Sequence, residues 1–122
     1  MTFVAAIRLF LVVEAIAFGI VSLIHAQVLA FGAPEPAAAR SEGIIAVALI
    51  AALALTWVWP ARTRGLAIAV HVFAIAFTLL GTYLNIRFGS GNPWDVPFHV
   101  GILLVMAWGL VVALRGRATR AE

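Results

Sequence analysis

The chain has 122 residues, of which 65% are hydrophobic and 11% are charged. Water-soluble domains are about half apolar and about a quarter charged. This composition therefore predicts one membrane domain spanning residues 1–122. The eight basic residues are all arginines, outnumber the five acidic residues and form no basic patch with interleaved aromatics, so nucleic acid is not an expected partner. The chain has no cysteine, which excludes disulfides, thiolate metal sites and cysteine nucleophiles.

Four segments approach the roughly 20 apolar residues that a membrane-spanning helix needs. They are predicted at about residues 3–31, 42–59, 65–86 and 96–114. The connections between them, "FGAPEPAAARS", "WPARTRG" and "RFGSGNPWD", carry the glycines and prolines that stop one helix and start the next. Connections this short make consecutive helices antiparallel, so the expected fold is an all-α, up-down four-helix bundle integral to the membrane.

The first segment, "MTFVAAIRLFLVVEAIAFGIVSLIHAQ", has the outline of a signal peptide that would end at Ala26. Its apolar part is too long for that and carries Glu14 in the middle, so we expect a transmembrane helix. His25 follows Glu14 by eleven residues, close to three turns, which places both side chains on one face, about 16 Å apart. A carboxyl group at mid-membrane must be protonated or paired, which makes Glu14 a functional-site hypothesis.

The meaning of Glu42 in the second segment depends on where that helix begins. If it begins at Ser41, Glu42 is an ordinary acid of the first turn. If it begins at Pro36, Glu42 lies more than a turn inside the helix, and its burial becomes significant.

The third segment carries a polar stripe. Four of its side chains fall within about 40° of one line along the helix: His71, Thr78, Thr82 and Asn85. The threonines are expected to bond back to their own helix. His71 leaves two interpretations open, a structural one in which its ring bonds a backbone carbonyl, and a functional one.

The fourth segment opens with "NPWDVPFHV". Asn92 as the N-cap, Pro93 as the first helical residue and Asp95 in the first turn make an ordinary helix start, which is the interpretation we favour. Alternatively, Asp95 is itself the cap and Pro97 lies in the first turn. His99 lies one turn deeper, where it either bonds a neighbouring helix or faces a site.

The arginines predict the orientation, because cytoplasmic loops carry the excess of basic residues. One side of the bundle holds Arg8, Arg62, Arg64, Arg115, Arg117 and Arg120. The opposite side holds only Arg40 and Arg87, and these are offset by Glu35, Glu42 and Asp95. We therefore expect both termini in the cytoplasm (N-in/C-in). Trp57 and Trp59 then fit the inner membrane interface, and Trp94 fits the outer one.

This orientation sorts the polar side chains by depth. Five of them lie in the outer third of the membrane and come from all four helices: His25, Glu42, Asn85, Asp95 and His99. Two lie deeper, at similar depth: Glu14 and His71. Because ionisable groups at membrane depth face the protein interior, we expect a polar funnel open to the outside, with ligand-binding residues at its mouth and a proton-coupling pair at its floor.

The sequence leaves the metal and the cofactor unknown. Histidine and carboxylate suit Zn²⁺ or non-haem iron by ligand type, but the chain has no HExxH or Glu-x-x-His motif, and its three histidines stand on different helices. A haem held between His25 and His99 agrees with their depth and is less favoured. No serine stands at a fixed spacing from a base, so an enzyme is not the expected function.

Three stretches together resemble a known family. They are "AIRLFLVVEAIAFGIVSLIHA", with an Arg near the start and a His at the end, "SEGIIAVALIAALALTWVWP", opened by an acid, and "NPWDVPFHVGILLVMAWGLVVALR", opened by an acid and a His. This pattern covers nearly the whole chain and resembles the DoxX-like group of small four-helix bacterial membrane proteins. The resemblance implies a bacterial inner-membrane location and a shared outer polar site for His25, Glu42, Asp95 and His99.

Some members of that group resemble quinone-linked redox subunits, and others are oxidative-stress accessory proteins. A thiol-based redox role is excluded here because the chain lacks cysteine. A second resemblance rests on Glu14, since small multidrug transporters also have four helices, similar length and a Glu in the middle of the first helix. Those transporters work as dimers and exchange protons at that carboxylate. Their glycine-rich third helix and aromatic cage are missing here, where only Tyr83 and scattered tryptophans are available.

Three functional hypotheses follow. The first is a DoxX-like membrane protein that holds a small apolar or quinone-like ligand, or a partner protein, against the outer polar cluster. The second is a proton-coupled small-molecule transporter that uses Glu14, together with His71. The third is a structural or assembly subunit whose polar groups are satisfied internally. The expected partners are the lipid bilayer and either a second copy of the chain or another membrane protein.

Overall fold

The computed structural model describes residues 1–88 and 92–116, and residues 89–91 and 117–122 fall outside that description. The described chain forms four long helices and one short 3-10 turn: α1 (Phe3–His25), α2 (Pro36–Val58), η1 (Pro60–Arg62), α3 (Thr63–Phe88) and α4 (Asp95–Arg115). Each long helix has the length and apolar composition needed to cross a membrane. The prediction of an all-α chain with four long apolar helices is therefore confirmed.

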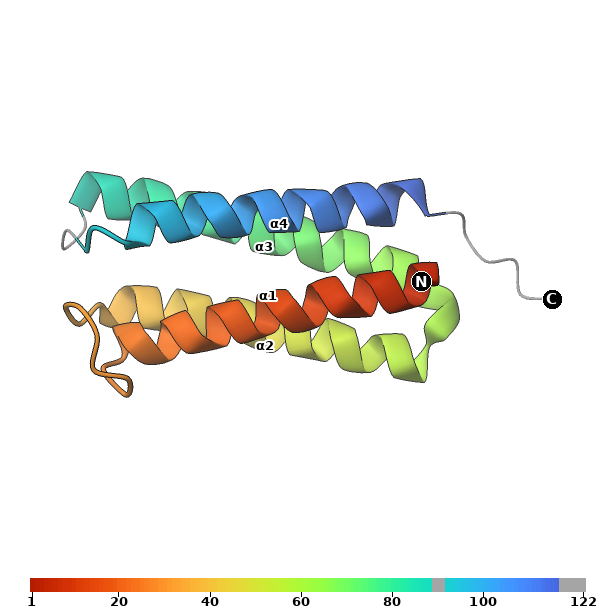
Figure 1. The fold of residues 1–122 in the computed structure, drawn as a ribbon, viewed down its shortest axis with the longest axis horizontal. Coiled ribbons are helices and arrows are strands. Elements are labelled where there is room, and N and C mark those ends of the chain that lie inside the picture. Colours follow the sequence, from red (N-terminus) through yellow and green to blue (C-terminus); the bar gives the residue numbers. More distant parts are fainter. Residues whose placement is uncertain (89–91, 117–122) are drawn as a thin grey trace.

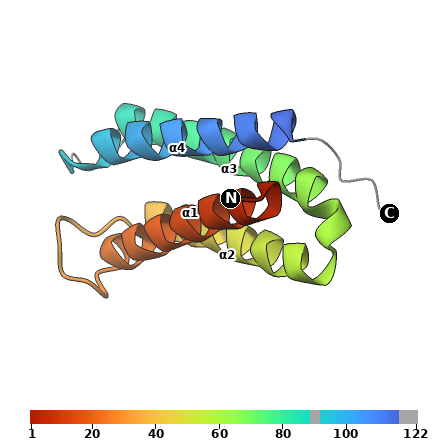
Figure 2. The same cartoon turned by 45° about the vertical axis from the view of Figure 1, so that its right-hand side comes forward.

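The helices form two antiparallel hairpins that lie side by side. In Figure 1, α1 and α2 form the lower pair and α3 and α4 the upper pair, and Figure 2 shows the same pairing after a rotation. α1 also packs on α4, and α2 on α3, so the helices follow one another around the bundle in chain order. We call the end with the start of the chain and η1 the Met1 end. The opposite end, where α1 and α3 finish and α2 and α4 begin, is the His25 end.

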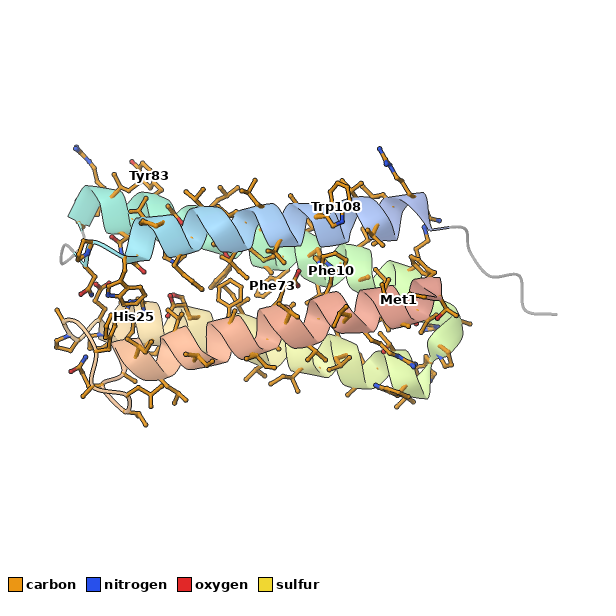
Figure 3. The ribbon with its side chains drawn as sticks, in the orientation of Figure 1. Met1, Phe10, His25, Phe73, Tyr83 and Trp108 are labelled. Atoms are coloured by element: carbon orange, nitrogen blue, oxygen red, sulfur yellow. The ribbon has the colours of Figure 1, made fainter. Side chains whose placement is uncertain are left out.

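The apolar core lies inside the bundle and draws on all four helices. Its largest fully buried apolar side chains are Phe18, Ile7, Leu11, Ile45, Leu49 and Met106. Phe18 of α1 meets Phe98 of α4 edge to face, with ring centroids 6.1 Å apart, and this contact joins the two hairpins. The outer surface is also apolar, as at Tyr83 and Trp108 in Figure 3. Helices that are apolar all round are typical of membrane spans.

α1 ends at His25, and the predicted end near residue 31 is wrong. Gln27 takes a left-handed conformation with φ of 60°. Two backbone hydrogen bonds close the turn, from Gln27 N–H to the Ile24 carbonyl (2.9 Å) and from Val28 N–H to the Leu23 carbonyl (3.0 Å). Together they make a Schellman ending, in which glycine usually holds the left-handed position. Glutamine at this position does not mark a helix end in the sequence, so the predicted helix extended beyond the actual one.

α2 begins at Pro36, well before the predicted start near residue 42. Pro36 stands in the first turn, where a proline suits a helix because its missing N–H would have no partner inside the helix. Glu42 therefore lies more than a turn inside α2, which is the second of the two interpretations that the sequence left open. α3 and α4 each extend one or two residues beyond the predicted ranges 65–86 and 96–114 at both ends.

The favoured start of the fourth helix, with Asn92 as its cap, is also wrong. α4 begins at Asp95 with Trp94 in the cap position, and within the described residues that cap makes no side-chain hydrogen bond. The Asn92 side chain instead reaches the loop between α1 and α2. Its Oδ1 accepts from Ala33 N–H (3.0 Å), and its Nδ2 donates to the Ala33 carbonyl (3.2 Å). Asn92 therefore joins the two loops of the His25 end.

Two arginines bind the ends of neighbouring helices at the Met1 end. Arg8 of α1 donates to the carbonyl (2.7 Å) and the hydroxyl (3.1 Å) of Thr56 near the end of α2. Arg64 of α3 donates to the carbonyls of Ala113 (3.3 Å) and Leu114 (3.2 Å) at the end of α4. The last carbonyls of a helix lack partners inside it and carry a partial negative charge, so a guanidinium satisfies both needs. Each arginine thereby holds its hairpin together.

Candidate functional site

Four ionisable side chains from three helices meet at the His25 end, and we call them the His–acid cluster: His25 of α1, Glu42 of α2, and Asp95 and His99 of α4. Figure 3 shows His25 at this end, between the two hairpins. His25 Nδ1 donates to Glu42 Oε2 at 2.7 Å. The other contacts are longer: His25 Nε2 to Asp95 Oδ1 at 3.6 Å, His99 Nε2 to Glu42 Oε1 at 3.5 Å, and His99 Nδ1 to Asp95 Oδ1 at 3.8 Å.

The cluster is almost completely removed from solvent. His25 and Asp95 are 0% exposed, Glu42 3% and His99 5%. One atom of each side chain finds no hydrogen-bond partner among the described residues: His25 Nε2, Glu42 Oε1, Asp95 Oδ1 and His99 Nδ1. A buried polar atom without a partner costs about 1–3 kcal/mol, so four in one place make the cluster a candidate site for a bound water, ion or ligand.

Asn85 adds α3 to the cluster, so that side chains from all four helices meet there. Its Nδ2 donates to Asp95 Oδ2 and, at 3.4 Å, to Glu35 Oε2. The other Glu35 oxygen accepts from Asn92 Nδ2. The structure therefore brings together all five side chains that the sequence placed in the outer third. It adds Glu35 and Asn92 as a second layer around the cluster.

Trp94 covers the cluster from the end of the bundle. Its ring stacks on His25 with centroids 5.1 Å apart and an interplanar angle of 21°. The ring of Phe31 lies tilted against Trp94, with centroids 5.8 Å apart. The sequence identified Trp94 only as an interfacial anchor. In the structure it also shields the buried imidazole from the loop side.

A cavity of about 530 Å³ lies beside the cluster, between the start of α2 and the end of α3. Most of its wall is apolar and comes from Pro36, Ala38, Phe77, Leu80, Leu84 and Phe88. Its polar wall includes Glu42, Asn85 and His99, three of the five predicted ligand-binding residues. The other two, His25 and Asp95, are absent from its described lining and lie behind Glu42 and His99.

The predicted proton-coupling pair is also in contact. Glu14 Oε1 of α1 and His71 Nε2 of α3 are 3.2 Å apart, and both residues are 0% exposed. His71 Nδ1 donates to the Ala67 carbonyl at 2.7 Å, as the structural interpretation requires, while Nε2 faces Glu14, so both interpretations of His71 stay open. Gly109 of α4 makes room for the pair, because a Cβ there would lie 2.4 Å from His71 Nε2.

An apolar contact layer of Phe18 and Phe98 lies between this pair and the His–acid cluster, and the described cavity does not run through to the pair as the predicted continuous funnel would. Phe18 stands on α1 between Glu14 and His25, is fully buried, and meets Phe98 of α4. The described lining of the cavity includes neither Glu14 nor His71. Sorting residues by depth could not reveal this layer, because it depends on which apolar side chains fill the bundle between two polar levels.

Several residues of the site gave weak sequence signals. Glu35 stands in a loop between two prolines, where it counted only as a surface charge. Asn92 counted as a helix cap. Gly109 is one glycine within an apolar helix. A glycine inside a helix costs about 1 kcal/mol relative to alanine, so its presence there was a weak signal that another side chain lies close to the backbone.

Carboxylates and imidazoles in a nearly dry site can exchange protons, bind a cation, or donate and accept hydrogen bonds with a ligand in the adjoining cavity. No protein family model, no curated protein and no solved structure matches this chain.

Proposed function

We propose that the chain is a multi-pass membrane protein that binds a small apolar molecule with a polar, quinone-like head in the cavity between α2 and α3. The observation that carries this proposal is the mostly apolar cavity with Glu42, Asn85 and His99 in one part of its wall. Small-molecule sites are typically cavities of about 300–1,000 Å³ with apolar walls and a few convergent polar groups. The cavity of about 530 Å³ fits that description.

The polar wall suits a ligand that both accepts and donates hydrogen bonds. Glu42 Oε1 and His99 Nδ1 are buried and have no hydrogen-bond partner within residues 1–88 and 92–116. A carbonyl or hydroxyl on the ligand would meet an imidazole donor and a carboxylate acceptor. The resemblance to the DoxX-like group, some of whose members resemble quinone-linked redox subunits, agrees with this proposal.

Two leucines of equal exposure provide a matched test. Leu79 and Leu80 are each 53% exposed, and only Leu80 is among the residues that line the cavity. We expect detergent-solubilised protein to bind decylubiquinone, Leu80→Trp to weaken that binding at least about tenfold by filling the cavity, and Leu79→Trp to leave it unchanged. Binding is measured by equilibrium dialysis and by the ligand-induced shift in unfolding temperature.

Substitutions in the polar wall test the head-group contacts separately. Glu42→Gln and His99→Gln should each reduce the affinity for decylubiquinone. Removing one partner of a buried hydrogen bond costs about 1–3 kcal/mol, which is about a 5- to 150-fold change. If Leu80→Trp and both polar variants bind as the unmodified chain does, the cavity is not the site. If no quinone binds to well-folded protein, a partner helix becomes the better candidate occupant.

We also propose a bacterial inner-membrane location with the Met1 end in the cytoplasm. The described arginines of that end, Arg8, Arg62, Arg64 and Arg115, support it through the excess of basic residues in cytoplasmic loops. Arg117 and Arg120, which entered the same prediction, lie outside the described residues. Because the chain has no cysteine, single substitutions test this cleanly. A membrane-impermeant thiol reagent applied to whole cells should label Pro34→Cys and spare Ala61→Cys; the reverse pattern would invert the topology.

The Glu14–His71 pair supports a second candidate function, proton-coupled transport. Both side chains are 0% exposed, and neither Glu14 oxygen has a hydrogen-bond partner in the described part of the chain. A carboxyl group in such a place binds and releases protons in small transporters. In proteoliposomes with a proton gradient, we expect uptake of tetraphenylphosphonium that Glu14→Gln abolishes. Equal uptake with both proteins, or none with either, would exclude this function and leave a structural role for the pair.

A further inference from the structure

His25 Nδ1 lies 2.7 Å from Glu42 Oε2, and an ionised carboxylate at that place can only accept a hydrogen bond. With Glu42 ionised and His25 neutral, the proton lies on Nδ1 and the lone pair on Nε2. That atom faces Asp95 Oδ1, another acceptor, at 3.6 Å, and both atoms are fully buried. Two acceptors that face each other in a dry site repel unless a cation stands between them.

The distances in the cluster agree better with a metal ion than with a bridging proton. A proton shared between nitrogen and oxygen draws the two atoms to about 2.7–2.9 Å, and 3.6 Å is not a hydrogen bond. The three longer contacts of the cluster measure 3.5, 3.6 and 3.8 Å. Ligands about 2.0–2.2 Å from a tetrahedral metal ion are about 3.4 Å from one another. The spacing of the cluster is therefore closer to that of metal ligands than to that of hydrogen-bonded partners.

Charge adds a second argument. If both imidazoles are neutral and both carboxyl groups are ionised, Glu42 and Asp95 place two negative charges in one buried site, which is costly without compensation. No arginine contacts either carboxylate among the described ion pairs, and the Asn85 amide that donates to Asp95 carries no charge. One divalent cation would neutralise both carboxylates.

We propose that the His–acid cluster binds one divalent transition-metal ion. The proposed ligands are His25 Nε2, Asp95 Oδ1 and His99 Nδ1, because both ring nitrogens face that one oxygen, at 3.6 and 3.8 Å. Glu42 also has an atom within 4.8 Å of those of His25 and Asp95, but its hydrogen bond to His25 Nδ1 gives it a supporting place beside the ion. Small side-chain rotations would bring them to metal–ligand distances. Imidazole with carboxylate suits Zn²⁺, Mn²⁺ or Fe²⁺, whereas Ca²⁺ and Mg²⁺ prefer sites made of oxygen alone.

The surroundings of the cluster resemble the support that metal ligands usually have. Glu42 orients the imidazole of His25 by accepting from Nδ1, and Asn85 holds the second oxygen of Asp95. Carboxylates and amides commonly fix metal ligands in this way. Trp94 stacks on His25 and covers the site from the loop side, which limits competition by water. The metal proposal stands on these contacts and does not depend on a ligand in the cavity.

The test uses full-length protein with its affinity tag removed, since a polyhistidine tag would itself bind metal. After treatment with EDTA, equilibrium dialysis against Zn²⁺ alone should give one ion per chain and a raised unfolding temperature. Asp95→Asn should weaken binding at least about 100-fold, the upper range for loss of a residue that only supports a metal ligand. Glu14→Gln, which alters the other buried His–Glu contact, should leave the stoichiometry and the affinity unchanged.

Cobalt provides a test that needs no variant. Co²⁺ added to the EDTA-treated, unmodified chain should give the intense visible absorption of a low-coordinate nitrogen and oxygen site, and Zn²⁺ should displace it. His99→Gln should alter this spectrum even if Asp95→Asn fails to fold. The proposal is overturned if the protein leaves the spectrum of free Co²⁺ unchanged, or if Asp95→Asn and His99→Gln both bind Zn²⁺ as the unmodified chain does. In either case the buried carboxylates are compensated by protonated side chains and not by a metal ion.

The outcome for the metal can be separated from the outcome for the cavity ligand. Decylubiquinone binding is measured on both the EDTA-treated and the Zn²⁺-loaded protein, because both proposals use His99. Quinone that binds only the EDTA-treated protein keeps both sites, since the ion then occupies the nitrogen that the head group needs. Metal binding without quinone binding rejects the proposed ligand and keeps the metal site. Quinone binding that Leu80→Trp blocks, in protein that takes up no metal, rejects the metal site and keeps the cavity.

Discussion

Gly109 is expected to be essential for the fit of α4 against the Glu14–His71 pair. A Cβ at this position would lie 2.4 Å from His71 Nε2, 3.0 Å from its Cδ2 and 3.3 Å from Glu14 Oε1. Ordinary van der Waals contact begins near 3.4 Å, so the ring or the helix would have to move by about 1 Å. The ring cannot easily give way, because its Nδ1 is held 2.7 Å from the Ala67 carbonyl.

These distances set the expected cost of Gly109→Ala. Overpacking a core costs about 1–3 kcal/mol, and loss of a buried charged contact costs about 3–5 kcal/mol. The better helix propensity of alanine returns about 1 kcal/mol. We therefore expect the variant to lose about 2 kcal/mol or more of unfolding free energy. The measurement is reversible unfolding of detergent-solubilised protein, followed by circular dichroism.

Gly101→Ala is the matched control on the same helix. A Cβ at Gly101 would meet no described atom within 4 Å, so this variant should be as stable as the unmodified chain or slightly more stable. A double-mutant cycle identifies the clashing partner, because Gly109→Ala should cost little once His71→Ala has removed the ring. If Gly109→Ala is as stable as Gly101→Ala, or costs the same in both backgrounds, the contact with His71 is not the reason for the glycine.

Three further predictions concern the ends of the bundle. Gln27→Gly should raise stability by about 1 kcal/mol in thermal unfolding, because an L-residue in the left-handed region is strained, and Gln27→Val should lower it. Asn92→Ala should cost about 1–2 kcal/mol in the same assay, through loss of its two hydrogen bonds to Ala33, and should speed proteolysis of the loop between α1 and α2. Arg8→Ala should cost about 2 kcal/mol and Thr56→Val less, since the arginine also binds the Thr56 carbonyl; equal costs would show that the carbonyl contact contributes nothing.

The course of the chain could be predicted because the apolar runs and the Gly and Pro breaks are strong local signals. The ends of the helices could not, since they depend on features with weak signals. At the end of α1, Gln27 occupies a position where glycine is usual. At the start of α4, Asn92 has the composition of a cap but bonds to Ala33, and that partner is distant in sequence.

The candidate site was predictable in its members and not in its geometry. Orientation and helix periodicity placed His25, Glu42 and His99 at one level, because an up-down bundle converts sequence position into depth. They could not show that Phe18 closes the space below that level, nor that Asp95 points inward as the first residue of its helix. Such features depend on the rotation of each helix about its axis, which apolar helices without a polar face leave undetermined.

The division of the His–acid cluster between the two hairpins has a consequence for biogenesis. The first hairpin emerges from the ribosome with His25 and Glu42 already able to pair, at 2.7 Å, whereas Asp95 and His99 belong to the second. The cluster is completed only when the hairpins dock, through the contacts of 3.6 and 3.5 Å that cross between them. A cation that binds the completed cluster would therefore stabilise only those chains whose second hairpin has docked on the first in the correct register.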